Sequence, residues 1–126
     1  MFVINEDKSI YVTRGDIAAI SLTAKNKEDG SEYTFKKNDV VRFTVYGRKD
    51  AERVLLQKEI PILEDSTAVQ VFLAEEDTRI GDVISKPTDY WYEVELNPDT
   101  YPQTIIGYDE EGPKIFRLYP EGNEGM

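Results

Sequence analysis

Two carboxylates on one strand come nearest to a catalytic pair in this sequence. Glu93 and Glu95 alternate with apolar residues in the run Tyr90–Leu96, so a strand would direct both to the same face. Glycoside hydrolysis needs only two carboxyl groups a set distance apart in a cleft. However, alternating acids are also typical of the solvated face of a strand, and 25 acidic residues make chance pairs inevitable. We therefore expect a wet face and no enzyme.

Other catalytic chemistry lacks its reactive side chains. The chain has no His and no Cys, which removes catalytic triads, imidazole acid–base catalysis, thiolate nucleophiles, disulfides and imidazole or thiolate metal sites. Its eight glycines form neither a Gly-x-Gly-x-x-Gly nor a Gly-x-x-x-x-Gly-Lys pattern, so a phosphate-cradling loop is not indicated. We expect no catalytic residue and no cofactor.

Two further motifs suggest binding, and both have a simpler interpretation. Glu75-Glu76-Asp77 with Asp82, and Asp109-Glu110-Glu111, could offer oxygen ligands to calcium, but neither matches the spaced Asp-x-Asp-x-Asp-Gly loop. We interpret them as exposed loop charge and expect no metal. Arg14-Gly15-Asp16 is the tripeptide that integrins recognise on protruding loops. Because it joins two strand-like runs, we interpret it as a structural turn.

Trp91 is the only Trp of the chain, and its neighbour Tyr92 decides which way it faces. If Tyr92 points inward, Trp91 shares the outer face with Glu93 and Glu95. An outward Trp near Tyr119 could anchor a protein interface or stack on a sugar ring. The alternative is a second covered face within the same domain, and the sequence leaves both open. We predict an interaction surface at Trp91, Glu93, Glu95 and Tyr119.

The segments that position these residues alternate with a period of two. Val41, Phe43 and Val45 would share one face of a strand, whereas Arg42 and Thr44 would lie on the other. We predict strands near 9–13, 17–24, 40–46, 54–60, 67–73, 90–97, 103–108 and 113–119, with a short one at 33–35. Ala74–Ile80 is too short for an independent helix, so we predict a single helical turn there.

Many short strands separated by turn residues predict an all-β fold. We expect one antiparallel, Ig-like β-sandwich over residues 1–126, with eight or nine strands, little helix and a polar tail at 121–126. Short loops between the last three strands predict an antiparallel meander from Tyr90 to Tyr119.

The charge of the chain excludes some partners. The net charge is −10, and residues 59–126 carry 16 acidic and 4 basic side chains. Such a field repels phosphate backbones and anionic lipids, so we expect no nucleic acid and no membrane as partner. The acidic excess favours solubility, or alternatively an acidic docking face for a basic partner. The amino terminus lacks a signal peptide, and synthesis in a bacterial cytoplasm is expected.

Several motifs, in their order and spacing, resemble small β-sandwich modules encoded by phages and prophages of Gram-positive bacteria. They are Ile10–Asp16 before an apolar strand, Tyr33, Asn38–Val45, Leu56-Gln57-Lys58, Leu73 through Asp77-Thr78, Tyr92–Leu96 and Phe116–Glu121. The modules are similar to the amino-terminal domain of phage upper baseplate proteins. This chain departs from them at Ile17, where Thr usually follows Arg-Gly-Asp, in a longer loop at Val83–Asp89, and in ending just after the last strand. The early end argues against a long receptor-binding extension.

The resemblance implies assembly rather than catalysis. A component of a tail or baseplate would contact other virion subunits or copies of itself, as a homo-oligomer or assembly component, with a virion location. A carbohydrate-binding or adhesion module, resting on Trp91 and the Tyr-rich strands, is the alternative.

Overall fold

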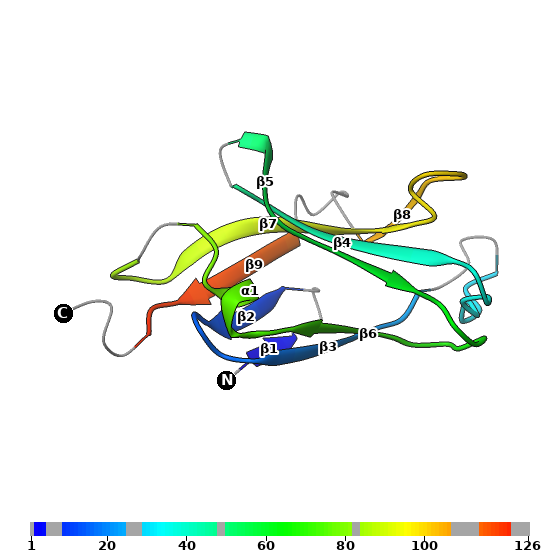
Figure 1. Cartoon of the computed structure of the whole chain (residues 1–126), viewed down its shortest axis with the longest axis horizontal. Coiled ribbons are helices and arrows are strands. Elements are labelled where there is room, and N and C mark those ends of the chain that lie inside the picture. Colours follow the sequence, from blue (N-terminus) through cyan, green and yellow to red (C-terminus); the bar gives the residue numbers. More distant parts are fainter. Residues whose placement is uncertain are drawn as a thin grey trace.

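The computed structural model describes the backbone of residues 2–4, 9–24, 29–47, 50–81, 84–106 and 114–121, and the side chains of these ranges except 2–4 and 50–53. Nine strands and one short helix are arranged along it (Figure 1). They are β1 (Phe2–Ile4), β2 (Ile10–Thr13), β3 (Ala18–Leu22), β4 (Val40–Gly47), β5 (Asp50–Pro61), β6 (Val69–Leu73), α1 (Glu75–Thr78), β7 (Thr88–Leu96), β8 (Gln103–Ile106) and β9 (Lys114–Tyr119).

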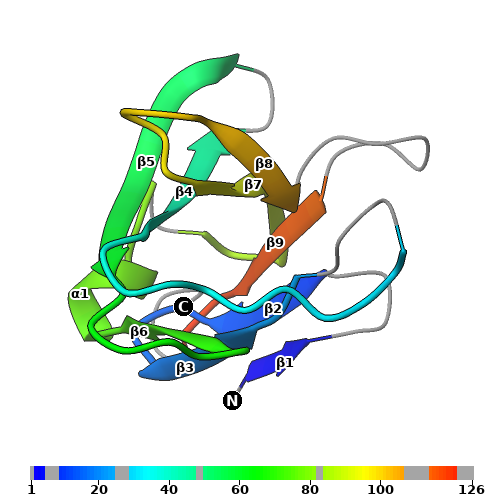
Figure 2. The ribbon, with the colours of Figure 1, turned by 90° about the vertical axis from the view of Figure 1, so that its right-hand side faces the viewer.

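The strands form two sheets that pack face to face (Figure 1). The larger sheet has the order β1-β2-β9-β7-β4-β5, with β8 beside β7, and the smaller sheet pairs β3 with β6. Figure 2 shows the larger sheet curling from β5 through β7 and β9 to β1, so that it wraps over the smaller one. The predicted all-β sandwich is confirmed. Its connectivity matches the Ig arrangement, in which β3 and β6 correspond to strands B and E, and β4, β7 and β9 to C, F and G.

The core lies between the sheets and follows the alternation of the sequence. Val41, Phe43 and Val45 are fully buried, as are Ile20 and Val71 from the opposing sheet. Each such side chain contributes about 1.5–3 kcal/mol when removed from water. The remaining fully buried large side chains are Phe35, Phe116, Ile10, Leu73, Leu118, Val12 and Val94.

Two predictions about strand pairing were wrong. The sandwich is not wholly antiparallel, because β2 runs parallel to β9 with Tyr11 opposite Arg117. The last three strands are not a meander either: β8 and β9 both pair with β7, along the edge opposite β4. Strand β7 is nine residues long, so its edge accommodates β9 along Thr88–Tyr92 and β8 along Val94–Leu96.

Most strand boundaries agree with the predicted ranges to within a few residues, and three features differ. Strand β1 was not predicted, β5 extends over 12 residues, and the expected strand at 33–35 is reduced to a single bridge between Phe35 and Ser66. The predicted helical turn is confirmed as α1. Residues 107–108 and 113 of two predicted strands, and 122–126 of the predicted tail, lie outside the described residues. Among the described residues, no helix has the length and apolar character of a membrane span.

The Arg14-Gly15-Asp16 tripeptide forms the corner between β2 and β3. Arg14 is only 4% exposed and donates a hydrogen bond from Nη2 to the carbonyl oxygen of Arg79. The amide of Gly15 donates to Thr78 Oγ1, and Thr78 Oγ1 lies 2.8 Å from the carbonyl oxygen of Asp16. The tripeptide is therefore a structural turn that packs on α1, as predicted, and it does not display its arginine.

Gly15 has φ +84°, and its missing side chain leaves room for Glu121. A Cβ at position 15 would lie 2.2 Å from Glu121 Oε1, which Arg79 holds by an ion pair at 2.8 Å. We predict that Gly15→Ala lowers the free energy of unfolding by about 1–2 kcal/mol, because the positive φ costs about 1 kcal/mol and the ends of the Glu121 and Arg79 side chains must also move aside, which weakens their ion pair. Urea denaturation measures this change.

Gly30→Ala is the matched control, because Gly30 has φ +72° and a Cβ added there would meet no atom within 4 Å. It should cost about 1 kcal/mol from backbone conformation alone. Adding Glu121→Ala to Gly15→Ala should recover part of the loss. Equal losses for the two glycine variants would mean that the close approach of Glu121 is unimportant.

Asp39 organises the turn before β4. Its carboxylate accepts hydrogen bonds from the Tyr33 hydroxyl, the Lys36 amide and the Asn97 side chain, at 2.9–3.1 Å. Asn97 in turn accepts from the Val40 amide at 2.8 Å, which links the start of β4 to the end of β7. Partial burial by itself raises the pKa of Asp39, but these hydrogen bonds outweigh it and lower the pKa below its usual value.

A lowered pKa in the folded state means that Asp39 stabilises the fold above its unfolded pKa of about 3.9, and that this contribution is lost as the pH falls. We predict that Asp39→Asn costs about 1–2 kcal/mol at pH 7, because one strong acceptor is lost. The difference from the wild type should shrink between pH 5 and pH 3, as followed by urea denaturation. Glu32→Gln, in the same loop, should keep the wild-type pH dependence. A constant difference across this range would contradict the role of Asp39.

Candidate functional site

The predicted surface residues on β7 lie on one face of the larger sheet. Tyr92, Val94 and Leu96 are buried, whereas Trp91, Glu93 and Glu95 are partly exposed on the other side of the strand. Tyr92 thus points inward, and Trp91 shares the outer face with Glu93 and Glu95, which is one of the two arrangements that the sequence left open. Tyr119, at the end of β9, also faces outward but is separated from Trp91, because the Cα partner of Trp91 on β9 is Ile115.

Trp91 belongs to an apolar row that crosses four strands. Its Cα partners are Ile115 on β9 and Tyr46 on β4, and Tyr46 is paired with Val54 on β5. Val54 is 48% exposed, so the row reaches solvent at its β5 end. Neighbouring strands lie about 4.8 Å apart, so this apolar row spans ~15 Å of the outer face.

A polar row runs beside the apolar row. Glu93 on β7 lies opposite Thr44 on β4, and Thr44 lies opposite Gln57 on β5. The Tyr46 hydroxyl donates a hydrogen bond of 2.5 Å to Glu93 Oε1, and Gln57 Nε2 lies 3.4 Å from Thr44 Oγ1. Thr44 is fully buried although it points to the outer face, so its neighbours cover it.

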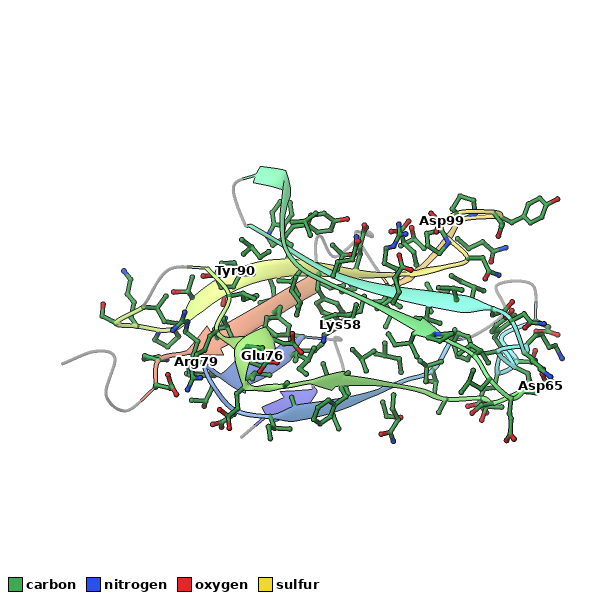
Figure 3. All side chains as sticks on the ribbon, in the orientation of Figure 1. Lys58, Asp65, Glu76, Arg79, Tyr90 and Asp99 are labelled. Carbon is green, nitrogen blue, oxygen red and sulfur yellow. The ribbon has the colours of Figure 1, made fainter. Side chains whose placement is uncertain are left out.

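The next row is charged and acidic. Glu95 lies opposite Arg42, and Arg42 lies opposite Glu59. Arg42 donates to Glu59 at 2.6 Å and to Asp99 at 3.3 Å, so two carboxylates share its charge. The hydrogen bond to Glu59 is the main cause that raises the pKa of Arg42. Figure 3 shows Asp99 at the end of the molecule opposite Arg79.

The part of the face over β2 and β9 is aromatic and cationic. Arg117 forms a bidentate pair with Asp89 at 2.6 and 3.2 Å, and its guanidinium lies 4.7 Å from the centroid of the Tyr11 ring. The hydrogen bonds to Asp89 raise the pKa of Arg117 above the usual value of an arginine. Tyr11 also contacts Tyr119 edge to face, with ring centroids 6.1 Å apart. The predicted residue Tyr119 is therefore part of this cluster.

Sequence reasoning missed several residues of this face. Tyr11, Tyr46, Val54, Ile115 and Arg117 were not selected, although the alternation of their strands predicted an outward direction for most of them. Only the register shows that they adjoin Trp91 or Tyr119. A shift in register between β4 and β5 brings Val54 opposite Tyr46, and no sequence signal marks this bulge.

Asp77, one of the acidic residues of α1, already has partners. Asp77 accepts from the Ala74 amide at 2.9 Å and pairs with Lys58 of β5 at 2.7 Å. Figure 3 shows Lys58 reaching between the two layers toward α1, near Glu76. In the described ranges, no three acidic residues converge as a metal site would require. The other calcium candidates, Asp82 and Asp109-Glu110-Glu111, lie outside these ranges.

The smaller sheet has an exposed face of different character. Phe72 on β6 is 58% exposed and lies opposite Ala19, and Gln70 lies opposite Ser21. Ile17, just before β3, is 57% exposed. No charged residue occurs in β3 or β6, although 32% of the chain is charged. The two outer faces of the sandwich therefore differ mainly in charge.

Comparisons with protein families, with curated proteins and with solved structures found no match for this chain.

The short contact between Tyr46 and Glu93 can be tested by titration. Burial, followed by the hydrogen bond to Glu93, raises the pKa of Tyr46 to about 12. We predict that Glu93→Gln lowers the pKa of Tyr46, because the neutral phenol loses its charged acceptor. A raised folded pKa means that the stabilisation is full below the unfolded pKa of about 10 and is lost as the pH rises toward 12.

The measurement is the tyrosinate absorbance of Tyr46, isolated by difference from a Tyr46→Phe variant. Glu59→Gln removes a charge from the same face without touching Tyr46 and should leave this pKa unchanged. An unaltered titration in Glu93→Gln would contradict the proposed hydrogen bond.

Proposed function

We propose that the chain is a non-catalytic assembly module of a phage or prophage particle, of tail or baseplate type, that works through protein–protein contacts. The assignment to a particle rests on the order of motifs that resembles phage upper baseplate domains, from Ile10–Asp16 to Phe116–Glu121. The working surface is the outer face of the larger sheet.

The observation that carries the proposal is the row Ile115, Trp91, Tyr46 and Val54 across four strands. Trp, Tyr and Arg are the residues most enriched where proteins bind each other tightly. Tyr11, Arg117 and Tyr119 add to this composition on β2 and β9 of the same face. Because regular strands carry these side chains, little backbone conformational entropy is lost when they are covered.

Carbohydrate binding is the second candidate function. It is favoured by the position of Trp91 next to Glu93 on one strand face, because an indole ring can stack on a sugar while a carboxylate accepts from its hydroxyl groups. The aromatic row is common to both candidates, so the ligand has to be identified by experiment.

We predict that the gene lies beside genes for tail, portal or capsid proteins and that the protein sediments with particles after prophage induction. Particle association should survive Phe72→Ser and decrease at least tenfold in Trp91→Ala, a loss of about 1.4 kcal/mol or more at an anchor. Immunoblotting of gradient fractions measures this ratio. Metabolic gene neighbours and absence from particles would refute the proposal. Binding on a glycan array that Trp91→Ala abolishes would favour the second candidate.

A further inference from the structure

We propose that the outer face of β9, β7, β4 and β5 docks a basic segment of a partner protein, with apolar side chains on the apolar row and Lys or Arg side chains on the carboxylates beside it. This inference rests on the proposed function, because it names the class of partner that the assembly module would bind.

The apolar row supplies the central contact. Trp91 lies between Ile115 and Tyr46, and the exposed Val54 extends the row to the edge strand β5. Strand β5 pairs only with β4 within the described part of the chain, so its outer edge can also accept a partner strand. An extended segment laid beside β5 would place alternate side chains over this face.

The charges beside the row select the partner. Glu93 and Glu95 on β7, Glu59 on β5 and Asp99 after β7 form an acidic group around Arg42. Among the side chains that the structure describes on these strands, Arg42 is the cation of this group, and Glu59 and Asp99 already share it. The Tyr46 hydroxyl that bonds Glu93 is neutral, so it leaves the charge of that carboxylate in place. A cationic segment would neutralise this excess and associate faster, whereas an acidic one would be repelled.

A second copy of the chain is disfavoured as the occupant by the same charges. A two-fold interface brings identical patches together, so Glu93 and Glu95 of both copies would approach each other, and each copy carries a net charge of −10. The uncharged face of β3 and β6 does not have this restriction, but no charge pattern on it indicates a particular partner. The acidic face therefore indicates its partner more specifically than the uncharged face does.

The test uses the full chain and a fluorescein-labelled, capped peptide of alternating Lys and Leu, with a Glu-Leu peptide of equal length as the acidic probe. Fluorescence anisotropy gives the Kd, and the emission of Trp91 reports the location, because Trp91 is the only Trp of the chain. We expect the basic peptide to bind and shift Trp91 emission, and the acidic peptide to do neither.

Two double variants distinguish binding to this face from a general effect of the negative charge of the chain. Glu93→Gln with Glu95→Gln should raise the Kd about tenfold at low salt, and less at 0.5 M salt, since screening weakens charge pairs. Glu32→Gln with Glu76→Gln removes equal charge from exposed positions elsewhere and should change the Kd less than about twofold. Val54→Ser should also raise the Kd about tenfold, whereas Phe72→Ser should not change it.

Three results would overturn the inference: equal losses in both charge pairs, a loss in Phe72→Ser but not in Val54→Ser, or binding of both peptides alike. A fourth such result would be a dimer in sedimentation velocity that the Val54→Ser substitution dissociates. This result would identify a second copy of the chain as the occupant. Particle association is measured separately. Peptide binding on this face without particle association would contradict the proposed function and keep the docking surface, and the reverse result would contradict only the docking surface.

Discussion

The pairing of β7 with β4 is the constraint on which the other features of the molecule depend. Val94 faces Phe43 and Tyr92 faces Val45, and all four side chains are buried in the core. A slip of one residue would turn every buried side chain of one strand toward water, at a cost of several times ~2 kcal/mol. The core therefore fixes the register, and the register in turn brings Trp91 beside Tyr46 and Glu95 beside Arg42.

Polar contacts hold the two ends of the sandwich. At one end, the corner at Gly15 is bonded to Thr78 of α1, and Arg79 pairs with Glu121 just after β9. At the other end, Asp39 and Asn97 connect β4 to β7, and Lys37 donates its amide to Asp65. Several of these side chains accept hydrogen bonds from backbone amides that have no partner within the sheets. These contacts fix the start of β4 to the end of β7 on one side, and the corner between β2 and β3 to α1 on the other.

The charge asymmetry of the chain becomes a spatial asymmetry in the fold. The acidic second half of the sequence provides β7, whose outward positions include Glu93 and Glu95, whereas β3 and β6 carry no charge on either side. Arg42 and Arg117, two cations on the outer face of the larger sheet, are paired with the acids Glu59 and Asp89. The face thus combines aromatic anchors with a net acidic edge, a combination suited to selective binding of a cationic partner.

Local patterns along the chain were enough to predict the fold class, the directions of the side chains on β4, β7 and β9, the turn at Gly15 and the lack of His and Cys chemistry. They were enough because alternation, turn formers and reactive side chains are local properties. Three features became visible only in the folded molecule: the parallel pairing of β2 with β9, the sharing of one edge of β7 by β8 and β9, and the row that joins Val54 to Trp91. These features arise from contacts between segments distant in sequence, where packing of the common core chooses among registers that local patterns leave equally open.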